Sequence, residues 1–279
     1  MPNNNLLLFA SHLSRGLVPL ANRLSHNGLN VTVAAPQNDN SEFLRTKFIK
    51  LRKIGSRLIG AKELKNFDGV IIALDDITQK FSKKHKIKSV KWTDQIGVDL
   101  SVWNPAKTSG NRQTMLLSRY NILPHQKMLF VPGITERDVN ALILAIQGLN
   151  RDDFVLALYG KMPYLSRLRI YKRIKSIPQI IYIGDNQDLP TTMRASFAII
   201  SLSPNDDFYK IAGMAMGRTT AFVAGNIKPN ILIKDLQETI KTIIDLPTKK
   251  REQYEYDNVI NAQNCNLEKN IEKIKNMVK

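Results

Sequence analysis

Short apolar runs alternate with longer segments of helical spacing along the first third of the chain. Residues 6–10 and 30–35 are apolar runs of strand length, and the leucines of residues 12–26 recur at the intervals of a helix face. Gly28 stands where that helix would end. The pattern predicts a strand, a helix and a second strand, which together form the first unit of an α/β sheet.

The alternation continues to residue 92. Residues 69–74 and 87–92 are predicted strands, and residues 77–85 are a predicted short helix. Before them, residues 41–66 place apolar side chains at near-helical spacing with Arg and Lys between them, which predicts a long basic amphipathic helix. Such a helix would join the core by its apolar face, lie on anionic lipid, or contact nucleic acid. Because the aromatic residues are scattered rather than gathered into a stacking surface, no nucleic acid is expected as a partner.

The second half of the chain repeats this order of elements. Helical stretches separate its predicted strands, as parallel crossovers require, and the tail, residues 235–279, is predicted to be helical. Residues 95–109 fit neither period and contain Pro105, so we expect the connection between two domains there, with residues 1–104 in one and residues 105–279 in the other. The predicted strands are residues 128–131, 154–159, 180–183, 197–202 and 220–224.

Residues 201–225 have the pattern most typical of a ligand site, because a buried strand, a polar loop, a helix and a second buried strand follow one another. Asn205, Asp206 and Asp207 occupy positions that cap a helix, and the N–H groups of its first turn would face any negative group in front of them. A phosphate is the expected ligand. The alternative is an ordinary connection that binds nothing.

Composition narrows the class of protein. The chain has 279 residues, of which 43% are apolar, and no apolar run approaches the roughly 20 residues that span a bilayer. The first residues lack the basic region of a secretory signal, so we expect a cytoplasmic protein. One cysteine, Cys265, and four scattered histidines predict neither a disulfide nor a metal site. The net charge of +17 is concentrated in residues 41–66 and 80–91. It favours peripheral attachment to the inner face of the cytoplasmic membrane, an anionic surface, through residues 41–66.

Several blocks of sequence occur in the order of one known family. LLLFASHLSRGLVPLANRLSHNGLNVTVAAP matches its first strand–helix–strand unit, and MLFVPGITERDVNALILAI matches the start of its donor domain. DLPTTMRASFAIISLSPNDDFYKIAGMAMGRTTAFVAG matches its donor loop, and Gly97, Val98, Asp99, Trp103 and Pro105 fit its hinge pattern GVD-x-x-x-F-x-P. On these blocks the chain resembles a divergent, shortened member of glycosyltransferase family 4, also called glycosyl transferases group 1.

The resemblance implies an α/β protein with the GT-B fold, in which two Rossmann-like parallel-sheet domains face a cleft and the N-terminal domain is shortened. It further implies transfer of a sugar from a nucleotide-sugar donor to a glycan or lipid-linked acceptor, in envelope polysaccharide or lipopolysaccharide synthesis. The transfer would retain the anomeric configuration and need neither a metal nor an organic cofactor. The implied catalytic residues are Asp206 and Asp207, and His12, Arg15 and Gly16 are implied on the acceptor side. The donor-binding candidates, which include glycines at the predicted strand ends, are Gly133, Thr135, Arg137, Gly160, Lys161, Gly184, Phe208, Tyr209 and Lys210.

The chain departs from the family at charged positions. The family neutralises the donor diphosphate with an Arg and a Lys after the first donor-domain strand. Here no Arg follows Gly133, and Asp138 falls near the expected Lys, which leaves Arg137 as the substitute. The second of two donor-loop glutamates, which binds ribose, falls among Ala212, Gly213 and Met214.

These departures leave two hypotheses. In the first, the chain is an active, retaining glycosyltransferase. In the second, it is a catalytically degenerate GT-B protein that acts as a binding or assembly partner. The N-terminal domain also differs from the family, because the sequence between Ala35 and Gly69 has room for one long helix and not for further strand–helix units.

Overall fold

The computed structural model describes residues 4–54, 57–184, 188–202, 207–223 and 229–278. The chain divides into two compact units: the first contains Met1–Asp99 and Cys265–Lys279, and the second contains Leu100–Asn264. This division differs from the predicted one at the C-terminal end, because the last helix, α11 (Leu267–Val278), belongs to the first unit. The reason is its apolar face: Leu267, Ile271 and Ile274 are buried in the first unit's core.

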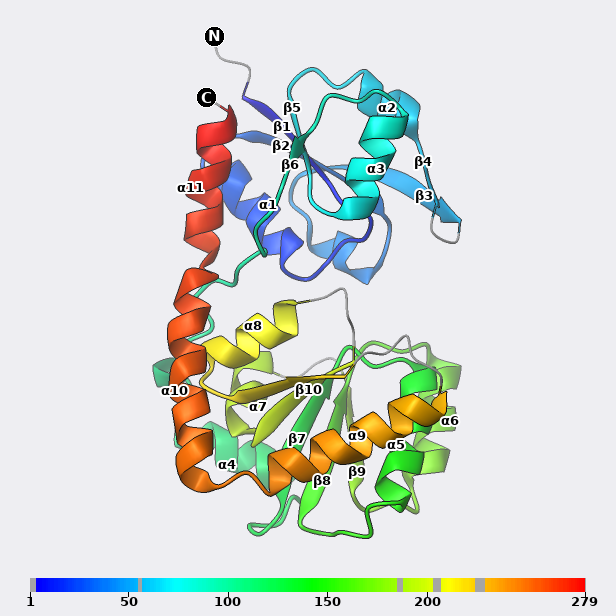
Figure 1. The fold of residues 1–279 in the computed structure, drawn as a ribbon, viewed down its shortest axis with the longest axis vertical. Coiled ribbons are helices and arrows are strands. Elements are labelled where there is room, and N and C mark those ends of the chain that lie inside the picture. Colours follow the sequence, from blue (N-terminus) through cyan, green and yellow to red (C-terminus); the bar gives the residue numbers. More distant parts are fainter. Residues whose placement is uncertain (1–3, 55–56, 185–187, 203–206, 224–228, 279) are drawn as a thin grey trace. The chain divides into compact units, whose positions relative to one another are not determined.

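The first unit is built on a six-stranded sheet with the order β4-β3-β2-β1-β5-β6 (Figure 1). All neighbouring strands are parallel except β3 and β4. The strands are β1 (Asn5–Phe9), β2 (Asn30–Pro36), β3 (Lys47–Ile54), β4 (Arg57–Ile59), β5 (Val70–Ala73) and β6 (Val90–Lys91).

Alternate side chains of the central strand β1 enter two different cores. Leu6 and Leu8 pack with α1 (Leu17–His26) and with α11, and these two helices lie side by side in Figure 1. Leu7 and Phe9 pack on the other face with α2 (Ala61–Lys65) and α3 (Asp76–Lys84). Because helices cover both faces, the parallel strands are apolar on both sides, as the sequence pattern indicates.

Residues 41–66 do not form the predicted basic amphipathic helix. The structure instead has the short 3-10 helix η1 (Asp39–Phe43), then β3, β4 and α2. β3 lies parallel to β2, with Thr32 opposite Lys47. This pairing satisfies the backbone groups of the segment, and the tertiary contact outweighs the helical spacing of its apolar residues. The prediction of one long helix between Ala35 and Gly69 is wrong for the same reason.

The second unit contains a five-stranded sheet with the order β11-β10-β7-β8-β9, and every neighbouring pair is parallel. Each strand predicted in this half is present. The strands are β7 (Lys127–Pro132), β8 (Phe154–Tyr159), β9 (Ile180–Gly184), β10 (Ala198–Ser201) and β11 (Thr219–Phe222). The helical elements are η2 (Pro105–Lys107), α4 (Gly110–Arg119), α5 (Glu136–Gln147), α6 (Tyr164–Ile174), α7 (Leu189–Ala195), α8 (Phe208–Ala215), α9 (Pro229–Ile244) and α10 (Thr248–Asn264).

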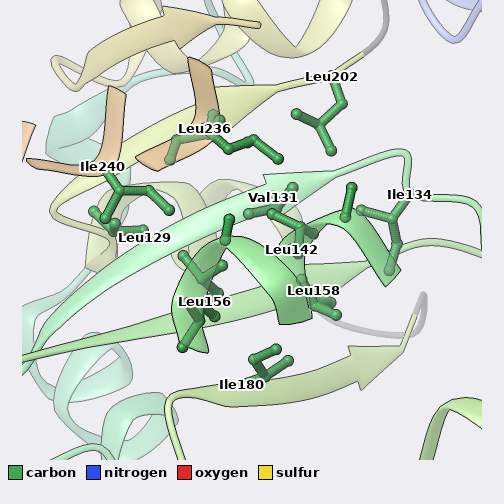
Figure 2. Close-up of a cluster of buried hydrophobic side chains, with 14 of the residues drawn as sticks. Leu129, Val131, Ile134, Leu142, Leu156, Leu158, Ile180, Leu202, Leu236 and Ile240 are labelled. Atoms are coloured by element: carbon green, nitrogen blue, oxygen red, sulfur yellow. The ribbon is translucent and has the colours of Figure 1, made fainter. Parts of the chain in front are cut away.

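The main core of the second unit lies between the sheet and the neighbouring helices α5 and α9 (Figure 2). Leu129 and Leu156 project from β7 and β8, Leu142 from α5, and Leu236 and Ile240 from α9; all five are fully buried. Close packing of these buried side chains holds the strands at fixed positions. The loops at the carboxyl ends of the strands therefore start from rigid points.

Candidate functional site

Three glycines stand at the carboxyl ends of β7, β8 and β9, at one edge of the second sheet. Gly133 (φ +68°) and Gly184 (φ +76°) have backbone angles that favour glycine. A Cβ on Gly133 would lie 3.2 Å from the Tyr209 ring, and a Cβ on Gly160 would lie 3.2 Å from the backbone oxygen of Ile134. At Gly184 a Cβ would meet no atom of the described residues within 4 Å. Gly133 and Gly160 therefore allow close packing of the site's own loops, whereas no described residue fills the space beside Gly184.

The side chains of Thr135 and Asp138 cap the N-terminus of α5. Asp138 Oδ2 accepts hydrogen bonds from the Thr135 backbone N–H (2.7 Å) and hydroxyl (2.6 Å), and the Asp138 N–H donates to Thr135 Oγ1 (3.4 Å). This capping box occupies the Thr135 N–H and sets a carboxylate at the helix N-terminus, near the position where the resemblance leads one to expect Lys. Arg137 lies within α5, and its side chain is outside the described residues.

The polar loop before α8 lies only partly within the described residues. Asp206 and Asn205 are outside them. Asp207 is exposed directly before α8, and its side chain does not cap the helix, contrary to the capping that the sequence predicts. Lys210 is exposed in the first turn of α8, and Lys161 is exposed in the segment after β8.

The first two residues of α8 are buried aromatic side chains. Phe208 is 9% exposed and Tyr209 is 6% exposed. Phe208 meets Trp103 edge to face at a ring distance of 5.4 Å, and Tyr209 meets Tyr159 of β8 at 6.5 Å. These contacts fix the start of α8 against the sheet. Any part that Phe208 and Tyr209 play in binding would therefore come from their backbone N–H groups rather than from their rings.

Gly213, in the middle of α8, packs too closely on the sheet to carry a longer side chain. A Cβ on Gly213 would lie 2.3 Å from Ile199 Cδ1 of β10 and 2.9 Å from Thr220 Cγ2 of β11. Ala212 is fully buried beside it. At Gly213, one of the three positions where the missing ribose glutamate could fall, the packing therefore leaves no space for a longer side chain.

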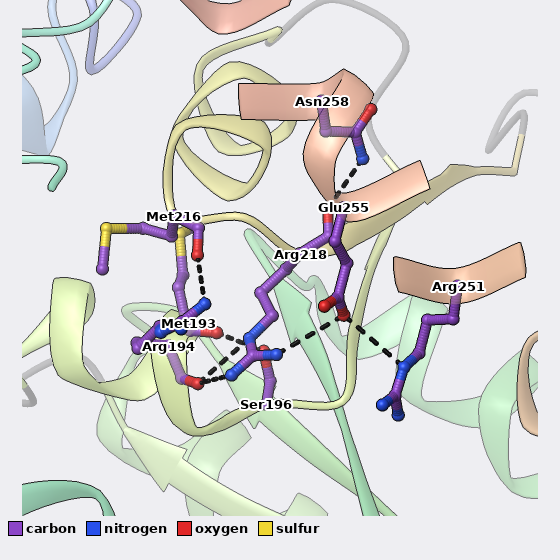
Figure 3. A network of polar contacts seen from close by, with 8 residues as sticks. All are labelled: Met193, Arg194, Ser196, Met216, Arg218, Arg251, Glu255 and Asn258. Carbon is purple, nitrogen blue, oxygen red and sulfur yellow. Dashed lines mark hydrogen bonds and ion pairs between the residues drawn. The ribbon is translucent and has the colours of Figure 1, made fainter. Parts of the chain in front are cut away.

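A polar network that sequence reasoning missed holds the C-terminal end of α8 (Figure 3). The Arg218 guanidinium donates from Nε and Nη2 to the Arg194 carbonyl, and Arg194 Nη1 donates to the Met216 carbonyl (3.0 Å). Glu255 of α10 lies 3.4 Å from Arg218 Nη1 and 3.8 Å from Arg251 Nε. The network joins α7, the C-terminal end of α8 and α10. No sequence motif indicated it.

The guanidinium of Arg218 is a largely buried positive charge, and its surroundings shift its pKa. Burial lowers the pKa of Arg218 from its ordinary value, the neighbouring Arg194 guanidinium lowers it further, and Glu255 opposes both. An arginine keeps its proton in proteins in spite of such shifts. The carbonyl and carboxylate partners are therefore what makes the buried charge tolerable.

In the first unit, the predicted acceptor-side residues lie between β1 and α1. His12 and Arg15 are half-buried, and Gly16 is buried directly before the helix. Beside them, Asp75 Oδ2 accepts a hydrogen bond from the Ser11 N–H (2.7 Å), while its Oδ1 accepts from Thr78 and caps α3 (2.9 Å). Asp75 was not a predicted site residue. Its position directly after a strand and before a helix is the signal that could have identified it.

Within the described residues, no group of three or more His, Cys, Asp or Glu side chains is arranged to hold a metal ion. In the same part of the chain, no helix combines the length and the apolar character required to cross a bilayer.

Two α/β units, each with a parallel-dominated sheet covered by helices, and a C-terminal helix that returns to the first unit, define the GT-B fold of glycosyltransferases. Solved structures with this fold match nearly the whole chain. A glycosyltransferase from Rickettsia africae ESF-5 matches with a TM-score of 0.68 and 14% identity, over 99% of this chain and 97% of that one. Anabaena HepE in complex with UDP and glucose matches at 0.64 and 11%, over 98% and 99%. WaaG, a glycosyltransferase involved in lipopolysaccharide biosynthesis, matches at 0.62 and 10%, over 99% of both chains.

At these identities the likeness shows the fold. No family model matches the sequence, and the comparison with curated proteins found no match.

Proposed function

We propose that this protein is a retaining glycosyltransferase of the family 4 type, which transfers a sugar from a nucleotide-sugar donor to a glycan or lipid-linked acceptor. The observation that carries the proposal is the GT-B fold over the whole chain, with glycine-containing turns at the carboxyl ends of β7, β8 and β9. Ligands of open α/β sheets bind at that edge. A solved neighbour, HepE, forms complexes with UDP and with UDP-glucose, which supports a nucleotide-sugar donor.

The donor's diphosphate would lie at this edge of the second unit. Lys161 and Lys210 are exposed there and would supply positive charge, and the N-terminus of α8 would add its dipole. Gly184 would let the backbone approach the ligand, and Gly133, Thr135 and Arg137 would flank it. Asp207, together with Asp206, would accept hydrogen bonds from the sugar hydroxyls. Catalysis of this kind acts by positioning and by electrostatic stabilisation of the leaving group.

The acceptor would bind to the first unit. His12, Arg15 and Gly16 stand in the loop between β1 and α1, where polar side chains and the start of a helix are available to hydroxyl or phosphate groups. WaaG acts in lipopolysaccharide biosynthesis, and we propose envelope polysaccharide or lipopolysaccharide synthesis for this protein as well. The reaction would take place in the cytoplasm. Membrane attachment through residues 41–66 forms no part of this proposal, because the helix on which it depended is absent.

One observation favours the alternative, a GT-B protein that binds without catalysis. The Asp138 carboxylate holds the N-terminus of α5 and accepts from the Thr135 N–H, at a place where a diphosphate needs donors and positive charge. Each lost charge-assisted contact costs about 1.5–3 kcal/mol, so the loss of the family's Arg, Lys and Glu weakens donor binding severely unless other groups replace them.

Calorimetric titration of the purified protein with UDP, GDP, ADP and their sugar conjugates tests the proposal. We expect one nucleotide to bind, with affinity lowered about tenfold by Lys210→Ala or Asp207→Ala, as the loss of one charge-assisted contact predicts. Lys172→Ala is the matched control, because Lys172 is exposed in the last turn of α6. Binding followed by donor turnover supports the transferase, and binding without turnover on any acceptor supports the alternative. No binding at millimolar nucleotide removes the assigned site.

A further inference from the structure

Six exposed lysines gather where the chain of the first unit runs from α3 to β6: Lys80, Lys83, Lys84, Lys86, Lys88 and Lys91. We call them the lysine surface. Residues 77–93 contain neither Asp nor Glu. α3 packs inward through the buried Thr78, Phe81 and Ser82, so Lys80 and Lys84, one turn apart, share its outer face.

Little of this positive charge is compensated. Lys91 Nζ lies 3.9 Å from Asp76 Oδ1, but the two side chains are 58% and 81% exposed, and an ion pair so open to water is weak. Among the described residues, the other five lysines of the surface form no ion pair. The surface therefore presents several unpaired ammonium groups to solvent.

The composition of the surface distinguishes between two kinds of polyanion. Lysine and arginine both bind nucleic-acid phosphates, but recognition of bases adds arginine forks and, for single strands, exposed aromatic rings on which bases stack. Residues 77–93 contain no Arg, and their aromatic side chains Phe81 and Trp92 are buried, at 9% and 3% exposure. Lysines suit lipid headgroups, because their long stems let the ammonium group reach charged oxygens at variable depth. Ile77 is 38% exposed, three residues before Lys80, and offers an apolar side chain at the same face.

We propose that the lysine surface, with Ile77, binds the anionic headgroups of a lipid bilayer. The surface is made by α3, the following loop and β6, so it does not depend on the amphipathic helix that residues 41–66 fail to form. It also shares no residue with the donor or acceptor groups assigned above. Lipid binding therefore stands or fails independently of sugar transfer.

Cosedimentation of the full-length protein with phosphatidylcholine vesicles, with and without phosphatidylglycerol, tests the proposal. We expect binding that requires phosphatidylglycerol and disappears in about 1 M salt, where the Debye length is about 3 Å. Each lysine at a membrane surface changes the partition about fivefold, so Lys80→Glu/Lys84→Glu/Lys88→Glu is expected to lower it at least about 100-fold. Ile77→Ser should lower it several-fold without changing its salt dependence.

The matched control is Lys172→Glu/Lys175→Glu/Lys241→Glu, which makes the same change in net charge at exposed lysines of the second unit. The control should bind vesicles about as well as the unchanged protein, and circular dichroism would verify that both triple variants are folded. Equal loss in both variants would show that overall charge, not this surface, binds lipid. Absence of binding even at low salt, or displacement from vesicles by an equimolar single-stranded oligonucleotide, would also overturn the proposal; the second result would identify a nucleic-acid surface.

Discussion

The side chains of Arg218 and Arg194 each donate hydrogen bonds to a backbone carbonyl at the C-terminal end of a helix near the other residue. The Arg218 guanidinium donates to the Arg194 carbonyl at the end of α7, and Arg194 Nη1 donates to the carbonyl of Met216, the residue that ends α8 (Figure 3). Helix ends leave carbonyl groups without partners, and cations are stabilised beside them. The exchange therefore ties together the two helices that flank β10, one of which begins at the proposed donor loop.

Replacing Arg218 should destabilise the second unit. We expect Arg218→Met to lower the free energy of unfolding by about 2–4 kcal/mol, because it removes the partner of the Arg194 carbonyl and leaves Glu255 with less compensation. Urea denaturation followed by circular dichroism measures the change. Arg112→Ala, at an exposed position in α4, is the control and should stay within about 0.5 kcal/mol of the unchanged protein. Similar effects in the two variants would mean that the network contributes little.

Gly213 should not accept even the smallest side chain. A Cβ there would lie 2.3 Å from Ile199 Cδ1, so Gly213→Ala is expected to cost about 1–3 kcal/mol of stability as overpacking. Ile199→Val removes the Cδ1 atom, and the double variant should recover part of the loss relative to the sum of the single changes. Additive effects in this cycle would show that the close contact does not limit the position. Gly213→Glu, which brings back a carboxylate, should unfold the unit rather than improve nucleotide binding.

Asp138 should oppose phosphate binding while it stabilises α5. We expect Asp138→Asn to lower stability by about 0.5–1 kcal/mol through the weakened cap, and to tighten nucleoside diphosphate binding several-fold through removal of a negative charge. Thermal unfolding and calorimetric titration measure the two effects. Asp152→Asn, exposed before β8 at the other end of the sheet, should leave the affinity unchanged. An Asp138→Asn variant with unaltered affinity would place the diphosphate elsewhere.

The Arg151–Asp153 ion pair should make part of the protein's free energy of unfolding depend on pH. Two hydrogen bonds, Nε to Oδ1 at 2.9 Å and Nη2 to Oδ2 at 2.7 Å, hold the pKa of Asp153 below its ordinary value. A carboxyl group with a lowered pKa in the folded state stabilises the protein above the pKa of the unfolded chain, near 3.9, and loses this contribution as the pH falls through the folded value.

Asp153→Asn should therefore cost about 1 kcal/mol at pH 7, and this difference should shrink as the pH falls below about 4. Urea denaturation of both proteins at a series of pH values measures it. A difference that stays constant down to pH 3 would show that the ionised form of Asp153 contributes nothing special.

Much of the candidate site could be predicted from the sequence, because its glycines follow apolar runs and parallel strands end at a common edge. Gly133, Gly160 and Gly184 stand where the pattern predicts. The burial of Phe208 and Tyr209 could not be predicted, because it depends on Trp103 and Tyr159, which are distant in the chain. The role of Asp138 as a capping residue was readable from Thr135 three positions earlier, and Asp75 was readable from its place between a predicted strand and a predicted helix, whereas the Arg218 network required the tertiary structure.

The sequence by itself determined which segments become buried strands in the second unit, since runs such as residues 154–159 have too few polar side chains to lie anywhere but inside a covered sheet. Only the tertiary structure decided the fate of segments whose local preference was ambiguous. Residues 47–54 are strand because β2 offered backbone partners, and residues 267–278 join the first unit because its sheet had an apolar face left to cover. In both cases the deciding contacts come from residues far away in the chain, and their free energy exceeds the small differences in local propensity.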